Sequence, residues 1–192
     1  MFINIGVFAQ NSTRLSQFDS RYWGVVLEQP AMKNVNVKRD VAYLSDEKGN
    51  LKIDIYSPPD FKPGVKLPAI IFLNGIGESL NPKDIKLKHW GIYSTWPKLV
   101  AANDFIGVSM ESDGGRIQEC FKALFNFLNE KGSTYNIDTE HLGVYAASAN
   151  VGQSASYLMS QDAYKGIKAA VFIMDLELRW QGHTEEICRF CL

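Results

Sequence analysis

The chain has 192 residues, of which 20 are basic and 21 acidic, so its formal net charge at pH 7 is -1. This length favours one domain that is large enough to bury a sizeable core. The balanced charge does not indicate a basic surface for binding nucleic acid. No stretch approaches the run of about 20 apolar residues that spans a membrane. Three cysteines cannot all pair, so they imply no disulfide framework.

Residues 1–34 are predicted to be an N-terminal segment outside the domain. Within it, residues 2–9 are a short apolar run, and Val7-Phe8-Ala9 before Gln10 resembles a signal-peptidase site. No basic residue precedes the run, as a complete signal would require. We therefore expect a remnant of an export signal at residues 1–9, and a secreted or periplasmic protein. The alternative is an ordinary N-terminus on a cytoplasmic protein.

Apolar and β-branched runs predict the strands of a domain at residues 35–175. The first two, residues 35–43 and 51–56, are typical of a hairpin around the turn at residues 46–50. Further strands are predicted at residues 66–73, 105–110, 142–147 and 167–174, with a loop at residues 135–139 leading into the fifth. The sixth strand is apolar on both faces apart from Lys168.

Helices are predicted between these strands from apolar residues at helical spacing. One face carries Tyr93, Trp96, Leu99 and Val100. A second face carries Ile117, Cys120, Phe121, Leu124, Phe127 and Leu128, a stripe that predicts core packing and not a cofactor site. Residues 83–88, which include three lysines, are predicted to be a solvated loop. Strand and helix alternate from residue 66 onward, so we expect a mostly parallel sheet with helices on both faces.

Ser148 is the strongest candidate for a catalytic residue. It stands at the tip of a turn of small residues, after a strand-like run and before a predicted helix at residues 152–159. Such a strand-turn-helix is the nucleophile elbow, which pushes the serine side chain out of the sheet toward a base and a carbonyl. Ala146 and Asn150 stand where the usual G-x-S-x-G pattern has glycines. The alternative is an ordinary helix start rich in small residues.

The loop Asn74-Gly75-Ile76-Gly77 follows the predicted strand at residues 66–73. Backbone N–H groups in such a loop hold the oxyanion that forms when serine attacks a carbonyl. The alternative interpretation is that the loop is only a tight turn after a strand. A dinucleotide-binding fingerprint is excluded, because Leu80 occupies the third glycine position and Pro82 follows it.

From about residue 35 to residue 175, the chain resembles the α/β-hydrolase family, in its branch of small esterases and lipases. The likeness rests on the 74–77 loop, on the approach at residues 136–143, and on the Ser148 elbow. It implies an α/β-hydrolase fold, a carboxylic ester as small-molecule substrate, and neither cofactor nor metal. It further implies Ser148 as nucleophile, with an oxyanion hole made by the N–H of Ala149 and an N–H from Gly75 or Ile76.

The family's chain order is serine, then an acid after a later strand, then a histidine near the end. The recognisable pattern stops near Asp175, so we expect the last strands of the fold to be lacking. His89 is predicted in an exposed loop and His141 at a surface turn. His183 lies too close to Asp175 for two further strand-helix units. We therefore expect an incomplete triad and weak or lost activity.

Residues 176–192 are predicted to be an irregular tail. Cys188-x-x-Cys191 with His183 upstream suggests metal ligands, but a zinc site needs four ligands, or three and a water, and Cys120 belongs to the core stripe. A redox role lacks the strand-to-helix placement that such motifs use. Neither cysteine function is favoured.

Two hypotheses remain open. The first is a serine esterase that works through Ser148. The second is a non-catalytic hydrolase-fold binding module or a decayed fragment, in which the serine has no base to activate it. In either case the strand at residues 167–174 should form an exposed apolar edge of the sheet. Such an edge favours self-association or poor solubility, unless residues 176–192 fold back over it.

Overall fold

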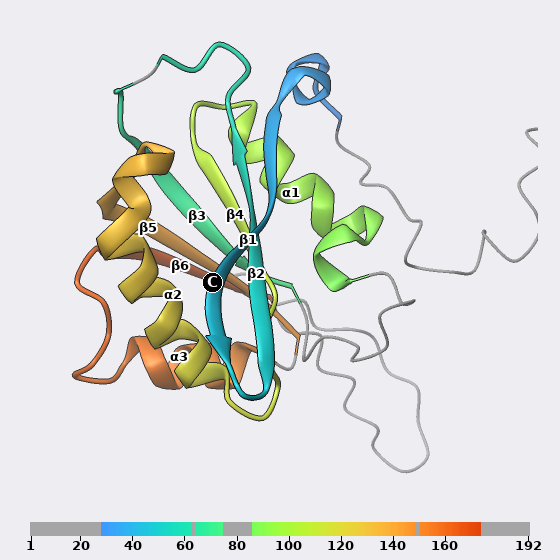
Figure 1. Ribbon diagram of the computed structural model, residues 1–192. Coiled ribbons are helices and arrows are strands. Elements are labelled where there is room, and N and C mark those ends of the chain that lie inside the picture. Colours follow the sequence, from blue (N-terminus) through green and yellow to red (C-terminus); the bar gives the residue numbers. More distant parts are fainter. Residues whose placement is uncertain (1–27, 63, 75–85, 149, 174–192) are drawn as a thin grey trace, which may run out of the picture.

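A six-stranded sheet forms the centre of the protein (Figure 1). The computed structural model describes residues 28–62, 64–74, 86–148 and 150–173. The strand order is β1-β2-β4-β3-β5-β6. The strands are β1 (Asn36–Asp46), β2 (Gly49–Ser57), β3 (Leu67–Leu73), β4 (Ile106–Met110), β5 (Ile137–Ala147) and β6 (Ile167–Ile173). β1 and β2 pair antiparallel and β2 joins β4 antiparallel, whereas β4, β3, β5 and β6 run parallel. The predicted mostly parallel sheet is confirmed.

Helices cover both faces of this sheet, as predicted (Figure 1). Helix α1 (Gly91–Ala101) packs on one face against β2, β3 and β4. Helices α2 (Ile117–Lys131) and α3 (Asn150–Leu158) cover the other face and contact each other. Three short 3-10 helices complete the described elements: η2 (Pro30–Asn34), η3 (Leu87–His89) and η4 (Gly132–Tyr135).

The main core lies between the sheet and α2. The predicted stripe on α2 is buried except at one position: Phe125 is in the core, whereas Phe127 is only half-buried and packs on Tyr135. Phe125 lies four residues after Phe121, one helical turn along the same face. Its ring stacks against Phe121 and against Tyr157 of α3. The aromatic contact with α3 therefore decides which phenylalanine faces inward.

Several predicted boundaries were wrong by a few residues. The hairpin turn is only two residues long, because β1 continues to Asp46 and β2 begins at Gly49. β5 begins at Ile137, inside the predicted loop, because Ile137 pairs with Leu67 of β3. Helix α3 begins at Asn150, two residues before the predicted start. In each case pairing or turn geometry extends an element beyond its apolar run.

β6 forms one edge of the described sheet, as predicted from its position. Val171 and Ile173 on this strand are 49% and 46% exposed, and Ala169 and Ala170 are exposed as well. The composition of the strand, apolar apart from Lys168, is typical of a strand with neighbours on both sides. The described residues therefore leave an apolar strand uncovered at this edge.

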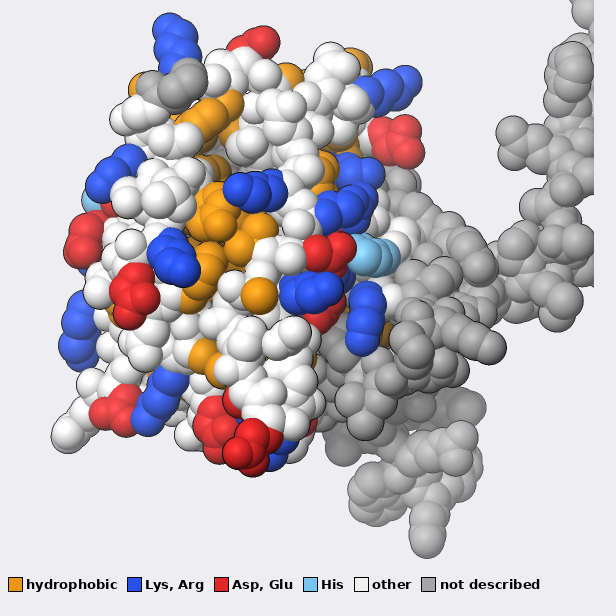
Figure 2. Space-filling view, viewed as in Figure 1, with side chains coloured by type: hydrophobic (Ala, Val, Ile, Leu, Met, Phe, Trp, Pro, Cys, Tyr) orange, Lys and Arg blue, Asp and Glu red, His pale blue; other side chains and the backbone are white. Residues whose placement is uncertain are grey.

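The surface carries charges of both signs. On the face shown in Figure 2, acidic and basic side chains alternate around a central group of hydrophobic side chains. No helix among the described residues is long and apolar enough to cross a membrane.

Some predictions fall on residues outside the described ranges. They concern most of the N-terminal segment, with the signal remnant at residues 1–9, and the oxyanion residues Gly75, Ile76 and Ala149. They also concern Asp175, His183 and the tail at residues 176–192, with its two cysteines. The remaining cysteine, Cys120, is buried in the core as predicted.

Candidate active site

Ser148 lies in a sharp turn between β5, which ends at Ala147, and α3, which begins at Asn150. Its φ angle is 56°, in the left-handed region that side chains with a Cβ rarely adopt. The Ser148 N–H donates to the Ile173 carbonyl at 2.8 Å, and the Ser148 carbonyl accepts from the Val151 N–H at 3.1 Å. The side chain is exposed. Strained backbone of this kind is typical of functional turns.

The turn lies at the edge of the sheet where the parallel strands end. Leu73 at the end of β3 pairs with Ala146 on one side and with Met110 at the end of β4 on the other. Asn74 therefore leaves β3 beside the Ser148 turn. In open α/β sheets, ligands bind outside the carboxyl ends of the strands.

Asn74 is only 2% exposed although it follows the last residue of a strand. Its Nδ2 donates to Ser109 Oγ at 2.7 Å. Because Ser109 lies in β4, this hydrogen bond fixes the first residue after β3 to the neighbouring strand. The oxyanion donors predicted in that connection, Gly75 and Ile76, lie outside the described residues, as does Ala149. That part of the site stays a prediction.

Neither histidine in the described part of the chain lies where it could activate Ser148. His141 is exposed and bonds through Nδ1 to Asp138 at 2.8 Å. It lies within β5 and not at the predicted turn, seven residues before Ser148, which at a rise of about 3.3 Å per residue is roughly 20 Å away. A general base must reach its proton within about 3.2 Å or through one water.

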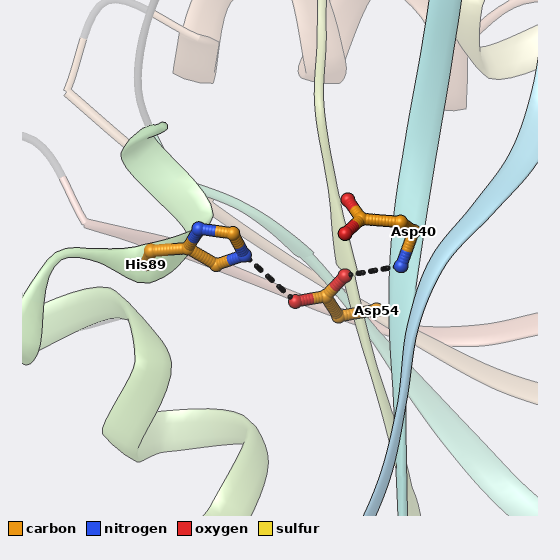
Figure 3. Close-up of side chains that lie close together, drawn as sticks. All are labelled: Asp40, Asp54 and His89. Atoms are coloured by element: carbon orange, nitrogen blue, oxygen red, sulfur yellow. Dashed lines mark hydrogen bonds and ion pairs between the residues drawn. The ribbon is translucent and has the colours of Figure 1, made fainter. Parts of the chain in front are cut away.

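His89 is excluded by the width of the sheet. Its Nε2 lies 3.1 Å from Asp54 Oδ2 on β2 (Figure 3). Asp54 pairs with Ser109, which pairs with Phe72, which pairs with Tyr145, so β2 and β5 are three strand spacings apart. At about 4.8 Å each, these spacings amount to roughly 14 Å, and Ser148 lies further along β5. His89 is also half-buried in η3, where an exposed loop was predicted.

A buried cluster of charges lies on the α1 side of the sheet. Lys88 and Asp54 are both fully buried, and Lys88 Nζ lies 2.8 Å from Asp54 Oδ1. Nζ also contacts Asp40 Oδ1 at 2.9 Å and Glu111 Oε1 at 3.1 Å. The prediction of a solvated loop at residues 83–88 is therefore wrong at Lys88. The reason is that three carboxylates from β1, β2 and the end of β4 surround its ammonium group.

The local backbone of β1 brings two of its side chains to this cluster. The pairing register of β1 with β2 shifts between Lys38 and Val41, and Asp40 in that bulge has a φ angle of 57°. The Asp40 N–H donates to Asp54 Oδ1 at 2.9 Å, and Arg39 donates to Asp54 Oδ2 at 3.1 Å. Bulges commonly re-aim side chains in this way.

Hydrogen bonding favours the charged form of Lys88. Burial alone lowers the pKa of Lys88, but the hydrogen bonds to Asp54 and Asp40 and the charge of Glu111 outweigh burial, and the pKa of Lys88 is raised. The hydrogen bond from Lys88 in turn lowers the pKa of Asp40. Lys88 and Asp40 therefore form an ion pair at neutral pH.

The same residues include a set with metal-ligand chemistry. Asp40, Asp54 and His89 offer ligand atoms that lie within 4.8 Å of one another (Figure 3). Lys88 and Arg39, however, already donate to the carboxylate oxygens of this set. A divalent cation would have to displace both cations of the chain, so the donor set does not fit a metal centre.

Sequence reasoning missed this cluster, although one signal was available. Asp54 stands between Ile53 and Ile55 in β2, and a charge inside a buried strand requires a partner. The partners lie far apart in sequence, so only the folded hairpin and η3 bring them together.

A shallow hollow lies at the opposite end of the sheet. It is lined by Pro58, Asp60, Phe61, Lys62, Val65, Leu67 and Asp104. Leu67 is the first residue of β3, whereas the Ser148 turn lies beside the last. The hollow is therefore separate from the candidate active site.

Comparison with known proteins gives a likeness at the level of structure. No family model matches the chain. No curated protein matches its sequence. Among solved structures, the apo form of Thermogutta terrifontis esterase 2 matches with a TM-score of 0.54 at 18% identity, over 82% of this chain and 62% of that one.

Two further solved structures are similar. Esterase 2 of Thermogutta terrifontis phosphorylated by paraoxon matches with a TM-score of 0.53 at 16% identity, over 83% of this chain and 65% of that one. Esterase B of Lactobacillus Rhamnosis (HN001) matches with a TM-score of 0.51 at 13% identity, over 74% and 46%. The chain thus spans less than two thirds of the length of each structure. At these identities the likeness establishes the architecture alone: the described residues have the α/β-hydrolase fold, with Ser148 at the turn after its fifth strand.

Proposed function

We propose that this protein is a serine hydrolase of esterase type that acts on carboxylic esters through Ser148. The observation that carries the proposal is the left-handed turn of Ser148 between β5 and α3, at the edge where the parallel strands end. This is the placement of a nucleophile elbow, which exposes the serine oxygen to a bound carbonyl. The solved esterases of the same fold support the same reading.

In the proposed reaction, Ser148 Oγ attacks the ester carbonyl while its proton passes to a base. The carbonyl oxygen becomes an oxyanion that accepts hydrogen bonds from the N–H of Ala149 and from Gly75 or Ile76. The alcohol then leaves with a proton, and water releases the acid from the acyl-serine. This chain supplies the nucleophile and the backbone donors.

We propose weak activity, because neither described histidine reaches Ser148. A serine without a positioned base is a poor nucleophile at neutral pH. The same observation favours the second candidate function, a non-catalytic binding module of the hydrolase fold. The reactivity of Ser148 separates the two.

A fluorophosphonate probe tests the proposal directly, because organophosphorus reagents phosphylate activated serines. Esterase 2 phosphorylated by paraoxon shows that this chemistry occurs on the same fold. We expect slow labelling that maps by mass spectrometry to the Ser148 peptide and is lost in Ser148→Ala. Ser156→Ala is the matched control, since Ser156 is an exposed serine on α3. Turnover of p-nitrophenyl acetate should stay near background.

Two outcomes would change this proposal. Labelling that is the same in Ser148→Ala and in the wild-type protein would refute Ser148 as nucleophile and favour the binding module. Fast labelling that depends on Ser148 would instead show that a base is present. His183→Ala would then be the first variant to test, because His183 is the histidine that follows Ser148 in the sequence.

We further propose that the protein self-associates through the β6 edge. The exposed Val171 and Ile173 side chains support this, because an uncovered apolar edge strand is a template for pairing with another chain. The occupant we propose is a second copy of this chain, pairing β6 with β6.

A further inference from the structure

A strip of apolar side chains lies on the α1 face of the sheet, beside the Ser148 turn. Tyr145 of β5 is on this face, because the centroid of its ring lies 6.4 Å from that of Trp96 in α1. Val171 of β6 pairs with Tyr145, and residues paired across neighbouring strands point to the same face. The residues two before and two after Val171 share that face. Together these side chains form the β5–β6 strip: Tyr145, Ala169, Val171 and Ile173.

The described helix on this side of the sheet leaves the strip open to solvent. Helix α1 packs against β2, β3 and β4, whereas β6 is the edge strand beyond β5. Three of the four members of the strip are exposed, and Tyr145 is half-buried. Phe172, between two of them in sequence, points to the opposite face and packs on the core. The strip is therefore an apolar surface without a charged member.

The β5–β6 strip is continuous with the Ser148 turn. The carbonyl of Ile173, the last residue of the strip, accepts a hydrogen bond from the Ser148 N–H at 2.8 Å. Tyr145 precedes Ser148 by three residues, which at about 3.3 Å per residue is roughly 10 Å along the strand. A group attached to Ser148 thus has an apolar surface beside it that extends away along β5 and β6.

We propose that the β5–β6 strip binds an unbranched alkyl chain of the ester substrate while the ester carbonyl lies at Ser148. This inference rests on the proposed function and names its substrate class. An extended chain spans about 1.2 Å per bond, so about eight carbons cover the roughly 10 Å from Ser148 to Tyr145. An alkyl chain suits the strip because it has no polar group that needs a partner. Pairing of β6 with a second copy uses the backbone groups of the edge and leaves this face open.

Chain length is the first readout, measured with fluorophosphonates that carry an ethyl or an octyl chain. Ser148 Oγ forms a bond to phosphorus, fluoride leaves, and the serine proton passes to solvent. Complete burial of a methylene is worth about fourfold in binding, so a methylene laid on an open face should gain about twofold. We therefore expect the octyl reagent to label Ser148 more than about tenfold faster than the ethyl reagent. Reagents with the chain on phosphorus or on the alkoxy oxygen show whether the strip takes the acyl or the alcohol side of the ester.

Strand β6 offers a matched pair of variants. Val171 and Ala170 are exposed neighbours, but Ala170 pairs with Val144 and points to the opposite face. Val171→Asp puts a carboxylate in the strip, whereas Ala170→Asp puts one on the other face of the same strand. The octyl-to-ethyl rate ratio should fall to about twofold or less in Val171→Asp, because a chain on the strip would desolvate the carboxylate. It should stay at the wild-type value in Ala170→Asp, and thermal melting shows that both variants are folded.

The second readout does not depend on reaction at Ser148. N-dodecyl dansylamide is a neutral probe whose fluorescence rises in apolar surroundings. We expect saturable binding to wild type and Ala170→Asp, and binding about tenfold weaker to Val171→Asp, since the probe loses the contact of several methylenes. If neither reagent labels wild-type Ser148, the proposed function fails, and probe binding alone decides whether the strip takes an alkyl chain.

Two results would overturn the inference. The first is equal binding of the probe to all three proteins, or no binding to wild type. The second comes from light scattering on the same proteins. If wild type and Ala170→Asp associate, Val171→Asp does not, and the probe binds none of them, a second copy covers the strip and not an alkyl chain.

Discussion

Helix α1 crosses β4 so closely at Gly107 that an added methyl group has no room. A Cβ at Gly107 would lie 2.7 Å from the Pro97 carbonyl oxygen and 2.8 Å from Pro97 Cα. Both are backbone atoms of α1, so no side-chain rotation relieves the overlap. Helix and strand would have to separate by about 0.7 Å, from 2.7 Å to the 3.4 Å at which ordinary contact begins.

We therefore expect Gly107→Ala to lower the free energy of unfolding by about 2 kcal/mol, within the range of about 1–3 kcal/mol typical of overpacked cores. Gly152→Ala is the opposite case. A Cβ at Gly152 meets nothing within 4 Å, and Gly152 lies inside α3. Alanine there should raise the free energy of unfolding by about 0.5–1 kcal/mol, because it removes the conformational freedom of glycine.

Urea denaturation followed by circular dichroism measures both changes, with the slope m serving as a check that the unfolded state is unchanged. The pair is diagnostic because both variants add the same atom. A Gly107→Ala protein as stable as wild type would show that α1 does not pack on β4 as described. The position of the helix that follows Lys88 and His89 would then need revision.

Three further predictions concern the charges and the sheet edge. Lys88→Met should lower the free energy of unfolding by about 3–5 kcal/mol, measured in urea, because it removes the ammonium group that lies between the buried Asp54 and Glu111 carboxylates. A loss below about 1 kcal/mol would contradict the buried cluster. The hydrogen bond from Arg116 lowers the pKa of Asp46 below its usual 3.8, so the pair stabilises the protein above that pH and loses its effect as the pH falls below it. The unfolding free energies of wild type and Arg116→Ala should therefore converge on acidification, and a constant difference from about pH 6 to about pH 2 would argue against the pair. Val171→Lys should shift size-exclusion elution with light scattering toward the monomer, whereas a wild-type protein that is already monomeric would refute self-association through β6.

The parallel part of the sheet could be predicted from sequence largely because β3, β4 and β6 consist mostly of apolar residues. Residues 67–73 and 106–110 form short runs of apolar and β-branched residues that fit a buried parallel strand. The Ser148 turn was predictable for a related reason, since a strand of this kind leads directly into small residues. The predicted ends of the strands were less accurate, because they depend on pairing between strands. For example, β5 begins at Ile137 because that residue pairs with Leu67 of β3.

The charge cluster could not be predicted because its members carry no local pattern. Lys88 lies in a lysine-rich stretch that is typical of solvent-exposed loops, and Asp40 lies beside other charged residues of β1. Their burial depends on a bulge in one strand and on a 3-10 helix that follows a long connection. Asp54 alone gave a signal of a buried charge in the sequence, because it stands between two isoleucines. Both isoleucines are fully or almost fully buried.

The turn of the proposed nucleophile is coupled to the exposed edge of the sheet. The Ser148 N–H donates to the carbonyl of Ile173, so the backbone of the turn is hydrogen-bonded to the last residue of β6. Any partner strand that orders β6 would also favour one conformation of Ser148. By thermodynamic reciprocity, a group attached to Ser148 that prefers the same conformation would strengthen association at β6 by the same factor. In the proposed assembly, occupancy of Ser148 and association at β6 are therefore expected to change together, so Ser148 labelling should be compared at several protein concentrations.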